Sequence, residues 1–279
     1  MKKLYLTSVV LVLSLSSLFA IEVLSVSQMI NMSIRQRGRT QKLLKSWLLK
    51  NENITVDFVT KELVSNTLQF DDNLEQLQDK VPNQEIKLAL KKVELQWGIF
   101  KKLIENDSNK NTLITVKASI NTLNASQEVV EAVIKFAKNQ NLSGNINTNN
   151  IYAYDDILAI TDVCCRQRLQ SQRLVIYYSL SISGKLFNAT PNKTAIEAAE
   201  MINSNFKKLM SNELTNSEIS DEIVTIYADW KKTYDLIKAN NYEAIEKRTI
   251  TLESLNDKMN KLFNSIDKVI SMYANLIKN

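Results

Sequence analysis

Apolar residues recur every three to four positions along nearly the whole chain, which places them on one face of an α-helix. Turn-forming residues interrupt this pattern and divide the chain into successive predicted helices. The predicted helices cover residues 26–50, 55–79, 84–105, 112–139, 152–186, 194–212, 217–239 and 242–278, with Thr55 as the expected N-cap of the second. Four glycines and two prolines in 279 residues are too few for a turn-rich β protein, so the pattern predicts an all-α fold.

A basic block occurs twice, 131 positions apart. Residues 35–43 read Arg-Gln-Arg-Gly-Arg-Thr-Gln-Lys-Leu, and residues 166–174 read Arg-Gln-Arg-Leu-Gln-Ser-Gln-Arg-Leu. Two further similarities lie downstream. Trp97 with Leu103 corresponds to Trp230 with Leu236 at an offset of 133, and the Leu-Asn pair at 123–124 recurs at 255–256. Three landmarks at nearly one offset indicate a tandem duplication.

Each copy holds four predicted helices joined by short connections, the arrangement of an antiparallel bundle with its apolar stripes facing inward. We therefore expect two tandem antiparallel four-helix bundles, one from residues 26–140 and one from 151–279. Residues 141–150 are polar, rich in asparagine and contain a glycine, so they are the expected linker.

The N-terminus has the features of an export signal. Lys2 and Lys3 precede an apolar stretch that ends near Phe19, and Ala20 is the candidate cleavage position, which makes residues 1–20 a signal peptide. The alternative is a retained anchor in the inner membrane formed by residues 4–24, which are just long enough to span a bilayer. Both the signal-peptide and the anchor hypotheses place residues 28–279 outside the cytoplasm, and the cleaved form would be periplasmic.

Composition removes several classes of function. The chain has no histidine, which excludes histidine acid–base chemistry and most transition-metal sites, so we expect no enzyme activity, no metal and no cofactor. The net charge of +5, without basic runs interleaved with aromatics, does not indicate a nucleic-acid partner. Cys164 and Cys165 are either small buried residues or thiols for an intermolecular bridge. Trp97 and Trp230 are expected core anchors.

The two basic blocks interrupt the inward stripes of their helices with polar residues. Arg35, Arg39 and Lys42 form one stripe of the first block, and Arg166 and Arg173 form the matching stripe of the second. Polar groups near a bundle seam cost about 1–3 kcal/mol each unless they are paired. Cations, amides and hydroxyls in two helical turns suit an anion pocket, because arginine donates in a planar fork. The alternative is that these side chains reach solvent or pair with carboxylates on neighbouring helices.

The block, placed near the start of a helix after an apolar segment, resembles the extracytoplasmic sensor domain of PilJ-type chemotaxis transducers and NarX-type nitrate/nitrite sensor kinases. That family carries a motif ending in Gln-Arg-x-x-Ser-Gln-Arg on the first helix of a four-helix bundle. The resemblance implies a small oxyanion ligand, with nitrate or nitrite leading. It also implies ligand-binding roles for residues at the motif positions and beside them: Arg35, Arg37, Gln41, Lys42, Arg166, Arg168, Gln172 and Arg173.

In the family, two first helices meet around one anion at a dimer interface. The duplication suggests an intramolecular pseudo-dimer, with one anion between Arg37 and Lys42 of the first block and Arg168 and Arg173 of the second; a true homodimer is the alternative. Because the family usually continues into a signalling domain that this sequence lacks, we expect a sensor that relays its state to a membrane sensor kinase or chemoreceptor. The competing hypothesis is a structural helical-bundle interaction protein with no small-molecule ligand.

Overall fold

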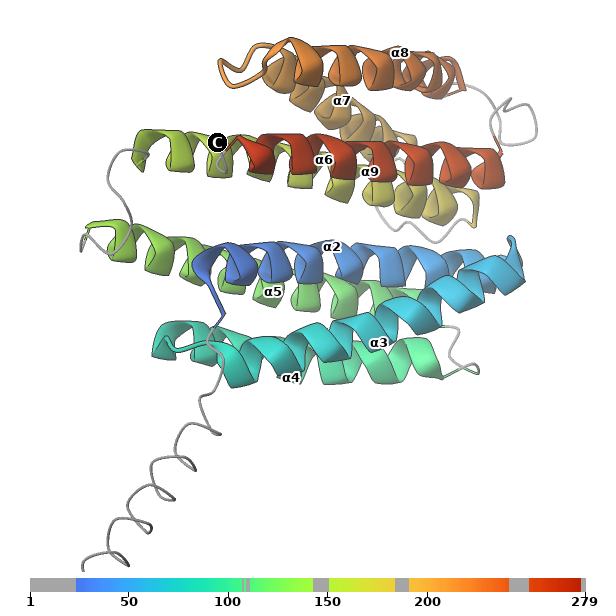
Figure 1. Ribbon diagram of the computed structural model, residues 1–279. Coiled ribbons are helices and arrows are strands. Elements are labelled where there is room, and N and C mark those ends of the chain that lie inside the picture. The colour runs from blue at the N-terminus through green and yellow to red at the C-terminus, as the bar shows by residue number, and fades with distance from the viewer. Residues whose placement is uncertain are drawn as a thin grey trace, which may run out of the picture.

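The computed structural model describes residues 24–106, 108, 111–142, 151–183, 191–240 and 251–276, and within them every regular element is an α-helix. The all-α prediction is therefore confirmed. The helices, labelled as in Figure 1, are α2 (Val26–Asn51), α3 (Val56–Lys80), α4 (Gln84–Glu105), α5 (Thr112–Leu142), α6 (Ile151–Ile182), α7 (Pro191–Met210), α8 (Ser217–Asn240) and α9 (Leu252–Asn275).

Local capping explains where several helices begin. The Ser25 hydroxyl accepts a hydrogen bond from the Gln28 backbone N–H at 3.2 Å, and the Gln28 side chain accepts one from the Ser25 N–H at 2.8 Å. This reciprocal pair starts α2. Asn83 starts α4 by accepting from the Ile86 N–H at 3.0 Å. Thr55 stands at the expected position before α3, but its side chain makes no capping bond, because its backbone is left-handed at φ 43° instead of extended.

Other predicted boundaries differ by a few residues or lie outside the described part of the chain. Helix α5 continues to Leu142, into the expected linker, and residues 143–150 lie outside the described residues. Helix α7 begins at Pro191, three residues earlier than predicted, because proline is tolerated in the first turn of a helix. The predicted signal peptide or anchor, the end of the fifth predicted helix and the start of the last also lie outside the described residues.

The helices pack in two sets of four. In the first half, α2 packs on α3 and α5, and α4 packs on the same two helices; in the second half, α6 packs on α7 and α9, and α8 packs on those two. The main contact between the halves is α2 against α6, so the α6/α9 layer lies over the α2/α5 layer in Figure 1. None of the described helices combines the length and apolar character needed to cross a bilayer.

The core consists of two apolar clusters, and each includes residues contributed by the other half. Trp97 and Trp230 are both buried, which confirms their predicted role as core anchors, and Trp97 stacks on Phe70 with ring centroids 4.0 Å apart. Cys164 and Cys165 are buried free thiols, as expected for small core residues. Burial raises the pKa of Cys165 to about 11.

Candidate functional site

Helices α2 and α6 run in the same direction (Figure 1). The contacts between residues show that their basic blocks are not level with each other. Arg37 on α2 bonds to Asp162 on α6, 125 positions later in the chain. Lys42 lies 4.3 Å from the centre of the Phe263 ring, and Arg168 lies 4.2 Å from the same centre. Because the two blocks are 131 positions apart in sequence, α6 is displaced along α2 by about six residues, or about 9 Å.

This displacement divides the group predicted to share one anion. Lys42 and Arg168 come together, but Arg37 instead donates to the Gln127 side chain at 2.6 Å and forms an ion pair with Asp162 at 3.3 Å. Arg173 is half-buried on α6 and lies outside the cleft that holds Lys42 and Arg168. The predicted set of Arg37, Lys42, Arg168 and Arg173 around a single ligand is therefore not what the geometry assembles.

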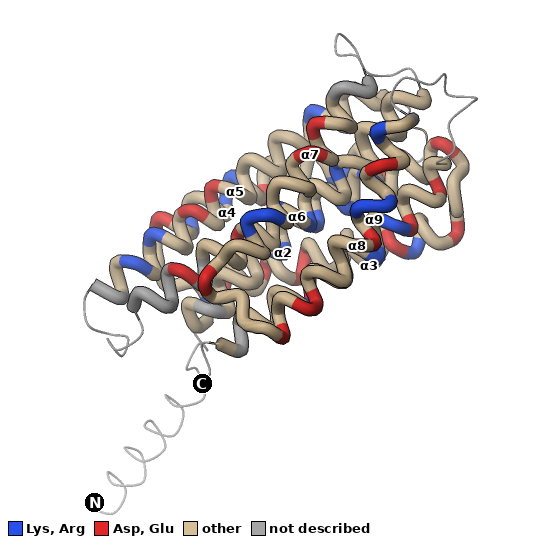
Figure 2. Tube along the Cα trace, turned by 90° about the horizontal axis from the view of Figure 1, so that it is seen from above, with Lys and Arg blue, Asp and Glu red and all other residues tan. Residues whose placement is uncertain are grey.

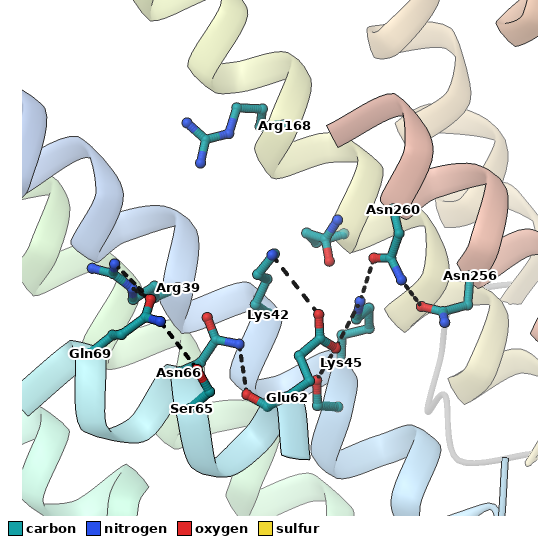
Figure 3. Close-up of polar contacts among 12 residues, drawn as sticks. Arg39, Lys42, Lys45, Glu62, Ser65, Asn66, Gln69, Arg168, Asn256 and Asn260 are labelled. Carbon is teal, nitrogen blue, oxygen red and sulfur yellow. Dashed lines mark hydrogen bonds and ion pairs between the residues drawn. The ribbon is translucent and has the colours of Figure 1, made fainter. Parts of the chain in front are cut away.

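The residues that do converge line a cleft of about 190 Å³. Its basic side chains are Arg35, Arg39 and Lys42 from α2 and Arg168 from α6. Its remaining walls are Asn66 and Gln69 from α3 and Phe263 and Asp267 from α9. We call this site the basic cleft; Figure 3 shows several of its side chains around a common space. Figure 2 shows acidic and basic residues interspersed along most helices, so the cleft is a local concentration of positive charge.

On the α3 side of the cleft, Arg39 is held by an amide. Its Nε and one terminal nitrogen donate to the Gln69 side-chain oxygen at 3.2 and 2.9 Å, and Gln69 in turn donates to the Ser65 hydroxyl at 3.1 Å (Figure 3). The other terminal nitrogen of Arg39 is buried without a partner among the described residues. Burial, reinforced by the charges of Arg35 and Arg168, lowers the pKa of Arg39 to about 10.

On the opposite side, Arg168 is anchored by α9. One terminal nitrogen pairs with the Asp267 carboxylate at 2.7 Å, and the guanidinium lies over the Phe263 ring. Its Nε is buried and has no partner in the part of the chain that the structure describes. A buried donor without an acceptor costs free energy, so this wall can still gain from an added acceptor.

Below the cleft lies a buried charge network that sequence reasoning did not identify. Lys45 has no exposed surface; it donates to the Asn260 side chain at 2.8 Å and pairs with Glu62 at 3.3 Å (Figure 3). Glu62 also accepts from the Ser46 hydroxyl at 2.7 Å and lies 3.9 Å from the Lys42 amine. Burial lowers the pKa of Lys45 to about 8, although Glu62 opposes that shift. The sequence feature that indicates this network is Lys45, which stands within the largely apolar run at 43–49.

The other predicted ligand residues lie outside the cleft. Arg166 is exposed and pairs with Asp162 at 2.7 Å. The Gln41 amide is buried and approaches Ser119 at 3.5 Å, and the buried Gln172 amide donates to Ser171 at 3.2 Å. Of the eight predicted residues, Arg35, Lys42 and Arg168 line the cleft. Its fourth cation, Arg39, was visible in the sequence as one turn from both Arg35 and Lys42.

The described residues contain no cluster of side chains that could hold a metal ion. No family model matches the chain, and no curated protein or solved structure shows significant similarity to it. The resemblance to nitrate sensors therefore rests on the repeated motif alone.

Proposed function

We propose that this protein binds a small oxyanion in the basic cleft. The observation that carries the proposal is the convergence of Arg35, Arg39, Lys42 and Arg168, from two helices, on one space with a single carboxylate in its lining. Such a concentration of charge is unfavourable without a counter-ion, and guanidinium groups are well suited to hold oxyanions through paired hydrogen bonds. Buried unpaired donors on Arg39 and Arg168 add to the gain from binding.

The motif resemblance makes nitrate and nitrite the first ligands to test, and it extends the proposal to an exported sensor. The cleft draws its walls from both halves of the chain, so a bound anion would contact both at once. A ligand that favours one relative placement of the halves shifts the population toward it. We propose that a partner sensor kinase or chemoreceptor detects this shift.

Tandem duplication is part of the same proposal, and matched burial at equivalent positions supports it. Gln36 and Gln167 are both buried, as are Leu43 and Leu174. Two further pairs also match, since Thr40 and Ser171 are buried and Arg35 and Arg166 are exposed; Arg37 and Arg168 differ, because only Arg37 is buried.

A second function is favoured by the ion pairs that the arginines already make. Arg37 and Arg166 share Asp162, and Arg168 pairs with Asp267. In a structural interaction protein, the basic blocks would serve only to form these ion pairs between helices. This alternative predicts no anion selectivity.

A thermal melt of the purified protein with nitrate or nitrite separates the two proposals, with chloride and sulfate at matched ionic strength for comparison. A specific ligand at a hundred times its dissociation constant should add about 2.7 kcal/mol of stability. Arg168→Gln should abolish the shift. Arg166→Gln, which changes an exposed arginine outside the cleft, should preserve it.

If no anion among the four raises the melting temperature beyond the effect of ionic strength, nitrate and nitrite are excluded as ligands. If larger oxyanions have no effect either, the oxyanion proposal is wrong and the interaction protein becomes the better hypothesis. Arg173→Gln adds a further contrast. A loss of the shift in Arg173→Gln but not in Arg39→Gln would favour the site expected from the motif over the basic cleft, because Arg39 lines the cleft and is not part of the motif site.

A further inference from the structure

We propose that the basic cleft selects an anion with two or more negative charges on separated oxyanion groups, a polycarboxylate or a polyphosphate, over a monovalent oxyanion. This inference rests on the proposed function and specifies the class of ligand. The inference is based on the charge, the length and the volume of the cleft, and on the carboxylate already present at one end.

The charge of the lining exceeds what a monovalent anion can neutralise. Four cationic side chains face one carboxylate, Asp267, which leaves a surplus of three positive charges. Glu62 lies beneath the cleft, but it is shared between Lys42 and the buried Lys45. Each further negative charge on the ligand therefore meets an unbalanced cation at short range. Burial is the main reason that the pKa of Arg39 is lowered, and repulsion from Arg35 and Arg168 adds to that shift.

The cations are spread along the cleft. Arg35 and Lys42 are seven residues apart on α2, which corresponds to about 10 Å along the helix axis. Arg39 lies on the α3 side, where it bonds to Gln69, and Lys42 lies near Arg168 at the Phe263 ring. A single planar anion would contact one set of donors. A ligand with an oxyanion group at each end would contact both.

The volume of the cleft agrees with a larger ligand. At about 190 Å³, the cleft is several times the roughly 30 Å³ that one water molecule occupies in the liquid. The Phe263 ring, which is 5% exposed beneath Lys42 and Arg168, lines part of the cleft and could contact the carbon backbone of a polycarboxylate. A polyphosphate would use the same cations without this apolar contact.

The ion pair between Asp267 and Arg168 shows that a carboxylate fits at the α9 end of the cleft. The Asp267 carboxylate takes one terminal nitrogen of Arg168 at 2.7 Å and leaves the Nε without a partner. Asp267 also repels any incoming anion, so removing its charge should strengthen binding. The repulsion from Asp267 grows with the charge of the ligand, but the attraction to the four cations grows in the same proportion and exceeds it.

The test is isothermal titration calorimetry on the full chain at fixed pH and ionic strength. The monovalent arm is nitrate and acetate, the carboxylate arm is succinate and citrate, and the phosphate arm is inorganic phosphate and pyrophosphate. We expect the best polyvalent anion to have a dissociation constant at least about tenfold lower than that of nitrate. Comparison of the carboxylates with the phosphates shows which of these two ligand classes the cleft prefers.

Variants connect the selectivity to the cleft. Arg39→Gln and Arg168→Gln should each weaken binding of the preferred polyanion by at least about tenfold, and Asp267→Asn should tighten it. Arg166→Gln, whose side chain is exposed and paired with Asp162, should bind like the unmodified protein. Circular dichroism of each variant checks that it is folded.

Nitrate binding as tight as that of every polyvalent anion would overturn this inference and leave the proposed function standing. Polyanion binding that is unchanged in both Arg39→Gln and Arg168→Gln would overturn it as well, because the attraction would then be non-specific. If no anion in the series binds, the inference and the proposed function both fail.

Discussion

At the scale of single residues, Lys45 is the least expected member of the core. Its amine is fully buried between α2, α3 and α9, where Asn260 and Glu62 are its bonded partners. The equivalent position in the second half holds Ile176, which is also buried. A charged group at a position that accepts isoleucine must be compensated, and burying an ion pair often gives no net gain in stability. Lys45 therefore places a charge beneath the cleft at an energetic cost.

The buried amine should make stability depend on pH. Its pKa is lowered to about 8 in the folded protein, so the unfolded chain, with an ordinary pKa near 10.4, holds this proton more tightly. The cost of the charged amine is fully present below pH 8 and is relieved as the pH rises toward 10.4. Relative to Lys45→Met, the free energy of unfolding of the unmodified protein should rise by roughly 1–3 kcal/mol between pH 7 and pH 10.

Urea unfolding of the two proteins at several pH values measures this difference, and the contributions of other titrating groups cancel between them. Lys92→Met is the control, because the Lys92 side chain is 63% exposed. Parallel pH profiles for the unmodified protein and Lys45→Met would show that the amine is not perturbed as described.

At the scale of the helices, α2 and α6 each carry buried polar side chains within their basic blocks. Gln36 and Gln167 occupy equivalent places in the two blocks and are both buried. Gln36 donates to the Phe70 carbonyl at 3.0 Å, which ties α2 to α3. Neither side-chain polar atom of Gln167 has a partner among the described residues. The same residue type thus has different surroundings in the two helices.

This difference predicts opposite effects of the same substitution. Gln167→Met keeps the length of the side chain and removes two unsatisfied polar atoms, so it should raise the free energy of unfolding by about 1 kcal/mol. Gln36→Met removes a formed hydrogen bond together with one unsatisfied oxygen, so it should lower the free energy of unfolding by less than about 1 kcal/mol. Chemical denaturation of both variants provides the comparison, with each serving as the control for the other. Equal destabilisation by both would mean that the Gln167 amide is satisfied in solution.

At the scale of the whole molecule, the two halves share their cores. Cys165, Ile176 and Leu180 of α6 belong to the apolar cluster of the first half. Leu49 of α2 and Val59 of α3 belong to the cluster of the second half. The Arg37–Asp162 and Lys45–Asn260 contacts cross the same junction. Neither half can separate from the other without exposing buried apolar and charged groups.

We therefore expect one cooperative unfolding transition, although the chain exceeds the usual size of a single two-state domain. Differential scanning calorimetry should give a calorimetric enthalpy equal to the van't Hoff enthalpy. Asp162→Ala, which leaves the buried Arg37 without its carboxylate, should lower the melting temperature without splitting the peak. Two resolved transitions in the unmodified protein would show that the halves unfold independently.

The sequence by itself determined the local features of this protein. Helical periodicity located α2, α4 and α8 to within one residue at either end, because side-chain burial on a helix follows a short repeat. It also marked the basic blocks as polar interruptions of inward stripes. Thr55 is the N-cap residue of α3 as predicted, but its side chain makes no capping bond, because backbone conformation at a single turn does not follow from residue type alone.

Only the tertiary structure decided which residues share the cleft. The register between two packed helices is set by how their side chains interdigitate, and the period of either helix alone does not reveal it. The displacement of α6 along α2 places Arg37 against Asp162, outside the cleft, and brings Lys42 to Arg168. Gln69 and Asp267 complete the site from helices whose sequences carry no basic motif. Contacts between helices distant in sequence therefore define the candidate site, even though its arginines are evident from the chain itself.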